Sequence, residues 1–514
     1  MLSAAMTPPD QRPRPRAALF RHSAVGGAAL ALAIGTAARP AAAAEETSCR
    51  YSLIQGSSLT DDCPICGRPT IILPMHGQFD LRKAAENPLF TTYALENIEF
   101  IAGSEGGNRF VMTGSGELDV GGEVALTQRL SLTVSIDDGH SPSQGVFEGE
   151  PVPVERQWPM VLAESPQTNG TPVRQFTLTL AAAPFRDLWF STANSLTSGT
   201  SQPPFEIYRN SEVLSVFGHR VQSNADLSRS LGIMPVVPDI GLDAFDVLPG
   251  GETAFSTTTS QFSESLGPLE PGDVLSDAGR ILWRASDLLT VFAPSPPVES
   301  PDIDAYHFLG KESAAFSVRE SFFSSRLGQT IGPGDLLSSD GTVLRTAKQL
   351  LENFAPEDGT SPPIDQIGLD AVFVWPSGEI WFSTQSGFQD KRLGPIRGGD
   401  LLSDDGYVVA GNLELVAAFS PLEDLADFGL DGLTVVTDTL PALAAPVVTR
   451  FELDATRSLW SLGWAGDGRF FQVLTADHPG GPFAPAAPIQ SARQLSGAAS
   501  PLAHPEAYFK VRQW

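Results

Sequence analysis

Three cysteines lie close together in this 514-residue chain, at positions 49, 63 and 66. Cys63 and Cys66 have the Cys-x-x-Cys spacing of a redox pair, of half a zinc site or of a disulfide. The Gly-Arg-Pro sequence at 67–69 disfavours the helix that a redox thiol needs, and a zinc site would need Cys49 and His76 as its other ligands. We therefore predict a disulfide drawn from Cys49, Cys63 and Cys66, with a zinc site and reactive thiol chemistry as the alternatives.

Seven aspartates recur at regular positions and form two sets. The first set stands in Asp-Ala or Asp-Gly pairs, and the second in Gly-Asp-Leu/Val-Leu-Ser segments. Repeated carboxylates are calcium candidates, because Ca²⁺ takes six to eight oxygen ligands. The alternative, which we favour, is that each carboxylate caps a turn, since no segment has the spacing of an EF-hand or of a calcium-binding nonapeptide. The calcium candidates are Asp243, Asp273, Asp304, Asp335, Asp370 and Asp400, and Asp431 completes the first set.

The sequence contains none of the common catalytic motifs. A Gly-x-Ser-x-Gly elbow, a His-Glu-x-x-His pair, a phosphate-binding loop and a dinucleotide fingerprint are all missing. Neighbouring carboxylates, Asp137 with Asp138 and Asp404 with Asp405, would serve a glycosidase only if the fold held two of them about 5–10 Å apart across a cleft. We therefore assign no catalytic residue.

The recurring aspartates belong to a tandem repeat whose Asp-Ala elements are separated by 61, 66 and 61 residues. After each of the first three, a Phe-Ser strand and then the Gly-Asp strand follow. An apolar pair with a phenylalanine three positions later predicts a helical turn with one buried face. These predicted turns contain Leu288, Leu289 and Phe292; Leu350, Leu351 and Phe354; Leu415, Val416 and Phe419; and, as an earlier copy, Val213, Leu214 and Phe217.

One such unit cannot bury its own apolar face, so neighbouring units must stack or close up. The back half of a unit occurs near 188–217 and a front half occurs alone near 431. A closed ring, as in β-propellers, would produce this offset by joining strands from both ends. An open stack that grows out of the preceding sheet is the alternative.

The array resembles the Asp-Ala…Phe-Ser-Thr…Gly-Asp-Leu-Leu-Ser repeats of large exported bacterial proteins of unknown function, some of them near calcium-binding repeat toxins. The resemblance covers residues 241 to about 435. The ending Ala507-Tyr508-Phe509-Lys510-Val511-Arg512-Gln513-Trp514 resembles the final strand of fibronectin type III-like modules. The repeat resemblance implies an extracellular scaffold and no catalytic residues.

Alternation of apolar and polar residues, as in Leu130 to Ile136 and Phe176 to Leu180, predicts half-buried strands before the array. The predicted fold class is all-β, with an N-terminal antiparallel sandwich or barrel, a propeller-like or stacked repeat array and a fibronectin type III-like end. The predicted division is a signal peptide at 1–44 and domains at 45–200, 201–440 and 441–514.

The first residues have the pattern of a secretion signal. Arginines at 12–21 precede an apolar run from Ala24 to Ala38, which is too short to span a bilayer, and small residues follow at 41–44. The alternative is a retained membrane anchor, which would need about 20 apolar residues. Removing residues 1–44 takes away one acidic and five basic residues, leaving 59 acidic and 28 basic ones, a net charge of −31. Such a charge repels nucleic acid.

We therefore expect an exported protein of the extracellular space, cell surface or periplasm, with no membrane span after signal cleavage. The leading hypothesis is a non-catalytic binding or structural protein that contacts glycans, surface polymers or other proteins. It predicts no cofactor, apart from the calcium candidates. The alternative is an exported carbohydrate-active or other hydrolytic enzyme.

Overall fold

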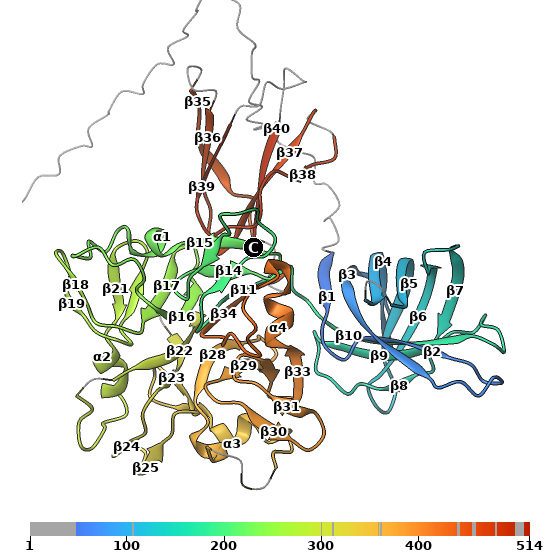
Figure 1. Ribbon diagram of the computed structural model, residues 1–514, viewed down its shortest axis with the longest axis horizontal. Helices are drawn as coiled ribbons and strands as arrows, with labels where there is room; N and C mark the ends of the chain where they lie inside the picture. Colours follow the sequence, from blue (N-terminus) through green and yellow to red (C-terminus); the bar gives the residue numbers. More distant parts are fainter. Residues whose placement is uncertain are drawn as a thin grey trace, which may run out of the picture.

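The computed structural model describes residues 48–104, 107–299, 301–310, 313–357, 359, 362–438, 443–454, 459–478, 481–498 and 508–514. The predicted signal peptide at 1–44 lies outside the described residues. The chain is all-β, as predicted, and three groups of sheets follow one another along it (Figure 1). Among the described residues, no helix is long and apolar enough to cross a membrane.

The first group is a ten-stranded antiparallel sheet with the main order β1-β10-β2-β3-β4-β5-β6-β7. Its strands alternate as predicted: Leu130, Leu132, Val134 and Ile136 are buried in a common core, whereas the residues between them are not. The strands are β1 (Cys49–Leu53), β2 (Ser58–Asp62), β3 (Ile71–Glu86), β4 (Phe90–Gly103), β5 (Arg109–Gly121), β6 (Thr127–Asp137), β7 (Ser143–Glu148), β8 (Val152–Pro153), β9 (Val161–Pro166) and β10 (Gln175–Ala183).

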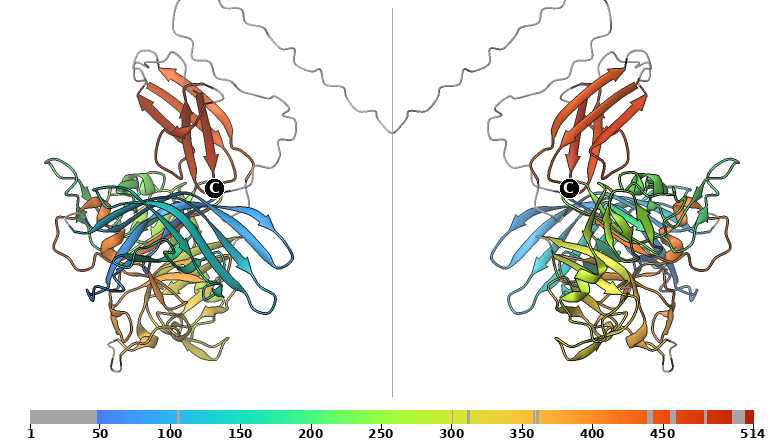
Figure 2. Two further views of the ribbon diagram at one scale, coloured as in Figure 1. Left: turned by 90° about the vertical axis from the view of Figure 1, so that its right-hand side faces the viewer. Right: turned by 90° about the vertical axis from the view of Figure 1, so that its left-hand side faces the viewer.

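The edges of this first sheet are linked to each other. β7 is bridged to the residue after β9, through Phe147 and Gln167, and β9 pairs with β10 in the middle of the sheet. The pairing path therefore returns on itself around the buried apolar residues, which is how a barrel removes its free edges. Figure 2 shows the curvature of these strands.

The repeat array consists of four sheets of four strands each. Their strand orders are β15-β14-β11-β34 (sheet 1), β16-β17-β20-β21 (sheet 2), β22-β23-β26-β27 (sheet 3) and β28-β29-β32-β33 (sheet 4). The bounds are β11 (Asp187–Ser191), β14 (Val213–Ser215), β15 (His219–Gln222), β16 (Leu242–Val247), β17 (Thr253–Thr257), β20 (Val274–Ser276), β21 (Arg280–Trp283), β22 (Ile303–Gly310), β23 (Ser313–Val318), β26 (Leu336–Ser338), β27 (Val343–Arg345), β28 (Leu369–Val374), β29 (Ile380–Thr384), β32 (Leu401–Ser403), β33 (Tyr407–Ala410) and β34 (Gly432–Val436).

The two ends of the array are hydrogen-bonded to each other. β34, the last strand of the array, pairs with β11, the first, in a register that runs from Asp187 opposite Val436 to Ser191 opposite Gly432. The inner strands β16, β22, β28 and β34 contact one another in turn, and β34 also contacts β16. The array is thus closed by strands from both of its ends, the arrangement predicted for a ring, and it is not an open stack.

Each sheet carries an outer two-stranded hairpin and a short helix. The hairpins are β12 (Leu196–Thr197) with β13 (Ile207–Tyr208), β18 (Gln261–Ser263) with β19 (Gly267–Leu269), β24 (Phe322–Ser324) with β25 (Gln329–Ile331), and β30 (Phe388–Asp390) with β31 (Gly394–Ile396). The helices are α1 (Asn224–Ser228), α2 (Ala285–Thr290), α3 (Ala347–Leu350) and α4 (Asn412–Leu415). Every hairpin is bridged to the segment after the helix of the preceding sheet, including Ser198 to Pro421 across the closure.

The predicted helical turns lie where expected in three units and elsewhere in one. The sets that begin at Leu288, Leu350 and Leu415 are buried; each begins within α2, α3 or α4, and its phenylalanine lies just after the helix. The earlier copy is wrong, because Val213 and Leu214 lie in strand β14 and Phe217 is 62% exposed. These residues match the Gly-Asp-Val-Leu-Ser strand instead, with Glu212 in place of the aspartate.

The boundary before the array also differs from the prediction. β10 ends at Ala183 and β11, which begins at Asp187, already belongs to sheet 1, so the change of sheet precedes residue 200. After the array the chain forms two three-stranded sheets, β35-β36-β39 and β38-β37-β40; their likeness to fibronectin type III modules stays a prediction. Their bounds are β35 (Val447–Asp454), β36 (Leu459–Ala465), β37 (Phe471–Ala476), β38 (Ala484–Pro485), β39 (Gln494–Ala498) and β40 (Tyr508–Gln513).

Candidate axial carboxylate site

The four aspartates of the first set come together where the inner strands meet. Asp243, Asp304 and Asp370 are the second residues of β16, β22 and β28, and Asp431 directly precedes β34. Because these strands contact one another around the array, equivalent residues lie near its axis. Asp243, Asp304 and Asp431 are buried and Asp370 is partly buried. The sequence repeat thus becomes one cluster of carboxylates from four sheets.

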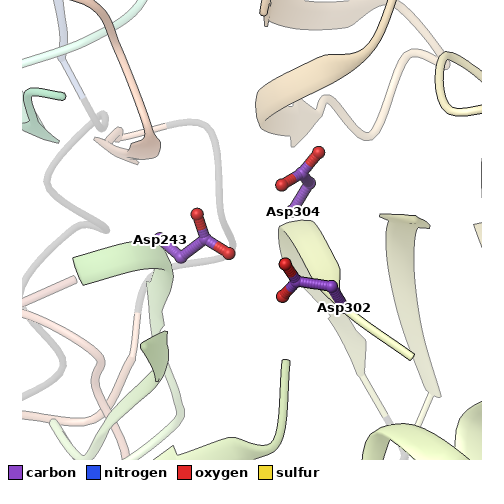
Figure 3. Close-up of side chains that lie close together, drawn as sticks. All are labelled: Asp243, Asp302 and Asp304. Carbon is purple, nitrogen blue, oxygen red and sulfur yellow. The ribbon is translucent and has the colours of Figure 1, made fainter. Parts of the chain in front are cut away.

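A fifth carboxylate, Asp302, joins the cluster from one repeat only. Carboxylate oxygens of Asp243, Asp302 and Asp304 lie within 4.8 Å of one another, and the three side chains face a common space (Figure 3). Arg319 lies beside them, with its Nη1 atom 3.2 Å from Asp302 and 3.9 Å from Asp304. Asp304 also accepts a hydrogen bond from the Gln385 side chain.

Burial raises the pKa of each aspartate on the axis. The pKa of Asp243 lies well above its ordinary value because of burial and then the charges of Asp304 and Asp302. Burial raises the pKa of Asp304 and that of Asp370 to about 7, although Arg319 opposes the rise in both. Burial, together with Asp370, raises the pKa of Asp431 well above its ordinary value. Carboxylates gathered in this way favour binding either a proton or a cation.

The second set of aspartates has a structural role. Asp273 accepts hydrogen bonds from the backbone N–H groups of Glu270 and Ala285, each at 3.1 Å. Asp335 and Asp400 make the same two bonds in the next two sheets. Each carboxylate thereby fixes the turn before the third strand to the start of the helix. Asp273, Asp335 and Asp400 are therefore turn caps, the interpretation favoured for all recurring aspartates, whereas Asp243, Asp304 and Asp370 depart from it.

Sequence reasoning missed Asp302 and Arg319, although the repeat contained a signal for both. Three units have glycine two residues before the axial aspartate, at 241, 368 and 429, and the remaining unit has Asp302. A Cβ atom on Gly241 would lie 2.0 Å from Thr258 Oγ1, and one on Gly368 would lie 2.2 Å from Gln385 Oε1. In the unit with Asp302, Arg319 stands at the position of Thr258 and Gln385. The ion pair of Asp302 with Arg319 therefore replaces the close contact between a glycine and a polar side chain.

The cysteines belong to the first sheet and the turn after β2, and none of them is part of the axial site. Cys63 and Cys66 form a disulfide with a Cα–Cα separation of 5.6 Å. Cys49 is free; burial raises the pKa of its thiol, which lies 3.8 Å from the carbonyl oxygen of Asp438. Cys49 pairs with Leu81 on β3, whereas Asp61, two residues before Cys63, pairs with Ile71. The two places thus lie ten residues apart along β3, and Cys63 and Cys66 are bonded to each other, so the four proposed zinc ligands do not form one site.

No family model matches the sequence, and no curated protein matches it. A similar solved structure is the extracellular domain of a putative hybrid two-component system from B. thetaiotaomicron, at 8% identity. The match covers 87% of this chain and 94% of that one, with a TM-score of 0.17. A likeness this weak carries no argument about fold or function.

The two neighbouring carboxylate pairs of the sequence have different surroundings. Asp137 and Asp138 accept backbone hydrogen bonds from Gly139 and His140 in the turn between β6 and β7. Asp404 and Asp405 line a cavity of about 270 Å³ together with Glu379. Burial raises the pKa of Asp404 to about 6, and that of Asp405 in the same direction.

Glu379 belongs to a further repeated network that the sequence analysis did not assign. It accepts hydrogen bonds from Trp381 Nε1 at 2.8 Å and Ser403 Oγ at 2.7 Å. In sheet 1 Asp187 takes the same place and accepts from Trp189 Nε1 at 3.0 Å and Ser215 Oγ at 2.7 Å. These acidic residues tie the second strand of a sheet to its third strand.

The Asp187 network predicts a pH dependence of stability. Burial raises the pKa of Asp187 to about 7 from an ordinary value of 3.8. Between about pH 4 and pH 7 the native state therefore binds a proton that the unfolded state has lost. The free energy of unfolding falls as pH rises, by up to about 1.4 kcal/mol per unit from this group. Urea denaturation at pH 4.5 and 6.5 should show a smaller fall in Asp187→Asn than in wild type, and equal falls would contradict the assignment.

Proposed function

We propose that the protein is an exported, non-catalytic binding or structural protein that contacts glycans, surface polymers or other proteins of the cell exterior. The observation that carries the proposal is the outer hairpin, which recurs on each of the four sheets. On three of the four hairpins an apolar side chain is exposed to solvent at one or both of two equivalent positions. A surface that repeats in this way suits an extended ligand better than a single small substrate.

The exposed residues of the hairpins occupy two positions. Phe262 and Phe323 are the middle residues of β18 and β24, and they are 54% and 44% exposed. Leu327 and Leu393 precede the glycine of the turn, and they are 37% and 44% exposed. Figure 1 shows β18–β19, β24–β25 and β30–β31 at the periphery of the array. Aromatic faces of this kind stack against the apolar faces of sugar rings.

The recurring polar groups support a framework role. Asp273, Asp335 and Asp400 hold backbone N–H groups, and Asp187 and Glu379 join strands within their sheets. The negative charge of the chain opposes nucleic acid as a partner. Export is supported by the signal-like start of the sequence and by the disulfide between Cys63 and Cys66.

The hairpin surface predicts the effect of removing its aromatic rings. The double variant Phe262→Ser and Phe323→Ser should lose at least tenfold in affinity for any glycan that wild type captures on a glycan array or in a cell-wall pull-down. The matched control is Phe217→Ser, which removes a 62% exposed phenylalanine that lies outside these hairpins. Equal binding by wild type and the double variant would remove the hairpins from the proposal.

The second candidate function is an exported hydrolytic enzyme, favoured by the cavity lined by Glu379, Asp404 and Asp405. An acid whose pKa lies near 6 next to other carboxylates suits general acid–base catalysis. A panel of chromogenic glycosides and esters tests it. Turnover that Asp404→Asn abolishes would establish the enzyme and overturn the non-catalytic proposal.

A further inference from the structure

We propose that Asp243, Asp302 and Asp304 bind a calcium ion at the axis of the array. The three carboxylates lie close enough to share one cation, with oxygens within 4.8 Å of one another. Oxygens on opposite sides of a calcium ion are about 5 Å apart, since Ca–O distances are about 2.3–2.6 Å. The proposal is independent of the binding function proposed for the outer hairpins.

One of these carboxylates is buried without a partner. Asp243 is 6% exposed, and its Oδ2 atom has no hydrogen-bond partner among the described residues. Figure 3 shows its carboxylate directed toward Asp302 and Asp304. Asp302 Oδ1 is also buried, and it too has no hydrogen-bond partner among the residues that the structure describes. A buried charged oxygen without a partner is costly, so two of them facing one space point to a ligand that supplies positive charge.

The nearby basic group does not balance the cluster. Arg319 is the basic side chain that lowers the pKa values of Asp243, Asp304, Asp370 and Asp431. Its side chain is 50% exposed, and it contacts Asp302 and Asp304 but leaves Asp243 Oδ2 free. A divalent cation supplies the remaining positive charge from within the space.

The departure from the repeat places the ion between two particular sheets. Asp243 belongs to β16 of sheet 2. Asp304 belongs to β22 of sheet 3, and Asp302 directly precedes that strand. Glycine stands at the position of Asp302 in the other three units, so among the described residues a set of three close carboxylates forms at this junction alone. A bound ion would join the inner strands β16 and β22 at the end that carries Asp243 and Asp304, in addition to the hydrogen bond that Asp246 accepts from the backbone N–H of Phe308.

Calcium titration of the purified chain tests the proposal. After treatment with EDTA, wild type should bind one Ca²⁺ by isothermal titration calorimetry, and saturating Ca²⁺ should raise Tm by several degrees. Asp302→Asn should weaken calcium binding at least tenfold, and Asp243→Asn should do the same. Asp302 is the safer variant because its side chain is 19% exposed, so its removal should leave the fold intact.

The matched control is Asp335→Asn, which removes a recurring aspartate that caps a turn. It should lower Tm in the absence of metal yet keep the wild-type calcium affinity and the wild-type Tm shift. The proposal fails if wild type binds no Ca²⁺ at millimolar concentration. It also fails if Asp302→Asn and Asp243→Asn bind Ca²⁺ as wild type does, since binding would then reflect the acidic surface. Glycan capture is measured both in EDTA and in Ca²⁺. A failure of the calcium proposal can then be told apart from a failure of the glycan binding proposed for the outer hairpins.

Discussion

Replacing Asp438 with alanine should lower the free energy of unfolding by about 3–5 kcal/mol, the cost of removing one partner from a buried group of charges. Its carboxylate accepts hydrogen bonds from Arg186 Nε at 2.7 Å, Trp514 Nε1 at 2.6 Å, Arg512 Nη2 at 3.2 Å and the backbone N–H of Arg50 at 3.0 Å. These donors come from the first sheet, from the segment before the array and from the last strand with its end. One carboxylate therefore joins three parts of the chain.

Urea denaturation followed by tryptophan fluorescence measures this loss, because Trp514 itself contacts the carboxylate. Hydrogen exchange should show faster exchange in β1 and β40 of the variant. The matched control is Asp424→Ala, which removes an exposed aspartate and should change stability by less than about 0.5 kcal/mol. A wild-type midpoint for Asp438→Ala would show that the three parts are held together by other contacts.

The elements of this fold were accessible from sequence because their signals are local. Alternation in Leu130 to Ile136 places one face of β6 in its core. The spacing of Leu288, Leu289 and Phe292 likewise places the end of α2 and the residue that follows it in a core. The offset between the two ends of the repeat was compatible with a closed ring and with an open stack, and the pairing of β11 with β34 corresponds to the ring.

The positions that the sequence did not disclose depend on contacts between distant segments. Val213, Leu214 and Phe217 fit the helical spacing, yet sheet pairing of β14 with β11 overrides it. Asp302 matters because β16 brings Asp243 beside it, 59 positions earlier in the chain. Asp438 gains its role from Arg50, Arg186 and Arg512, which are 388, 252 and 74 residues away in the chain. Such groups cannot be ranked among 60 acidic residues until the fold places them.

Replacing Asp246 with alanine should have an effect of similar size, about 3–5 kcal/mol, because this fully buried carboxylate serves three inner strands at once. It accepts hydrogen bonds from Thr434 Oγ1 at 2.7 Å and the backbone N–H of Phe308 at 2.9 Å, and His307 Nδ1 lies 3.1 Å away. Arg469 from the C-terminal sheets also donates to it. Alanine would leave these donors buried without an acceptor.

The pH dependence of this loss has a definite sign. Burial alone would raise the pKa of Asp246, but Arg469 and His307 hold it below its ordinary value of 3.8. The stabilisation by Asp246 is therefore complete above about pH 4 and is lost as pH falls below that value. The difference in the free energy of unfolding between wild type and Asp246→Ala should accordingly become smaller in acid.

A double-mutant cycle with Arg469→Ala isolates the contact between the array and the C-terminal sheets. The two single variants should together lose more stability than the double variant, because each leaves the other charge buried without its partner. Purely additive losses, with no change between pH 7 and pH 3, would show that the Arg469 contact does not contribute to holding the C-terminal sheets on the array.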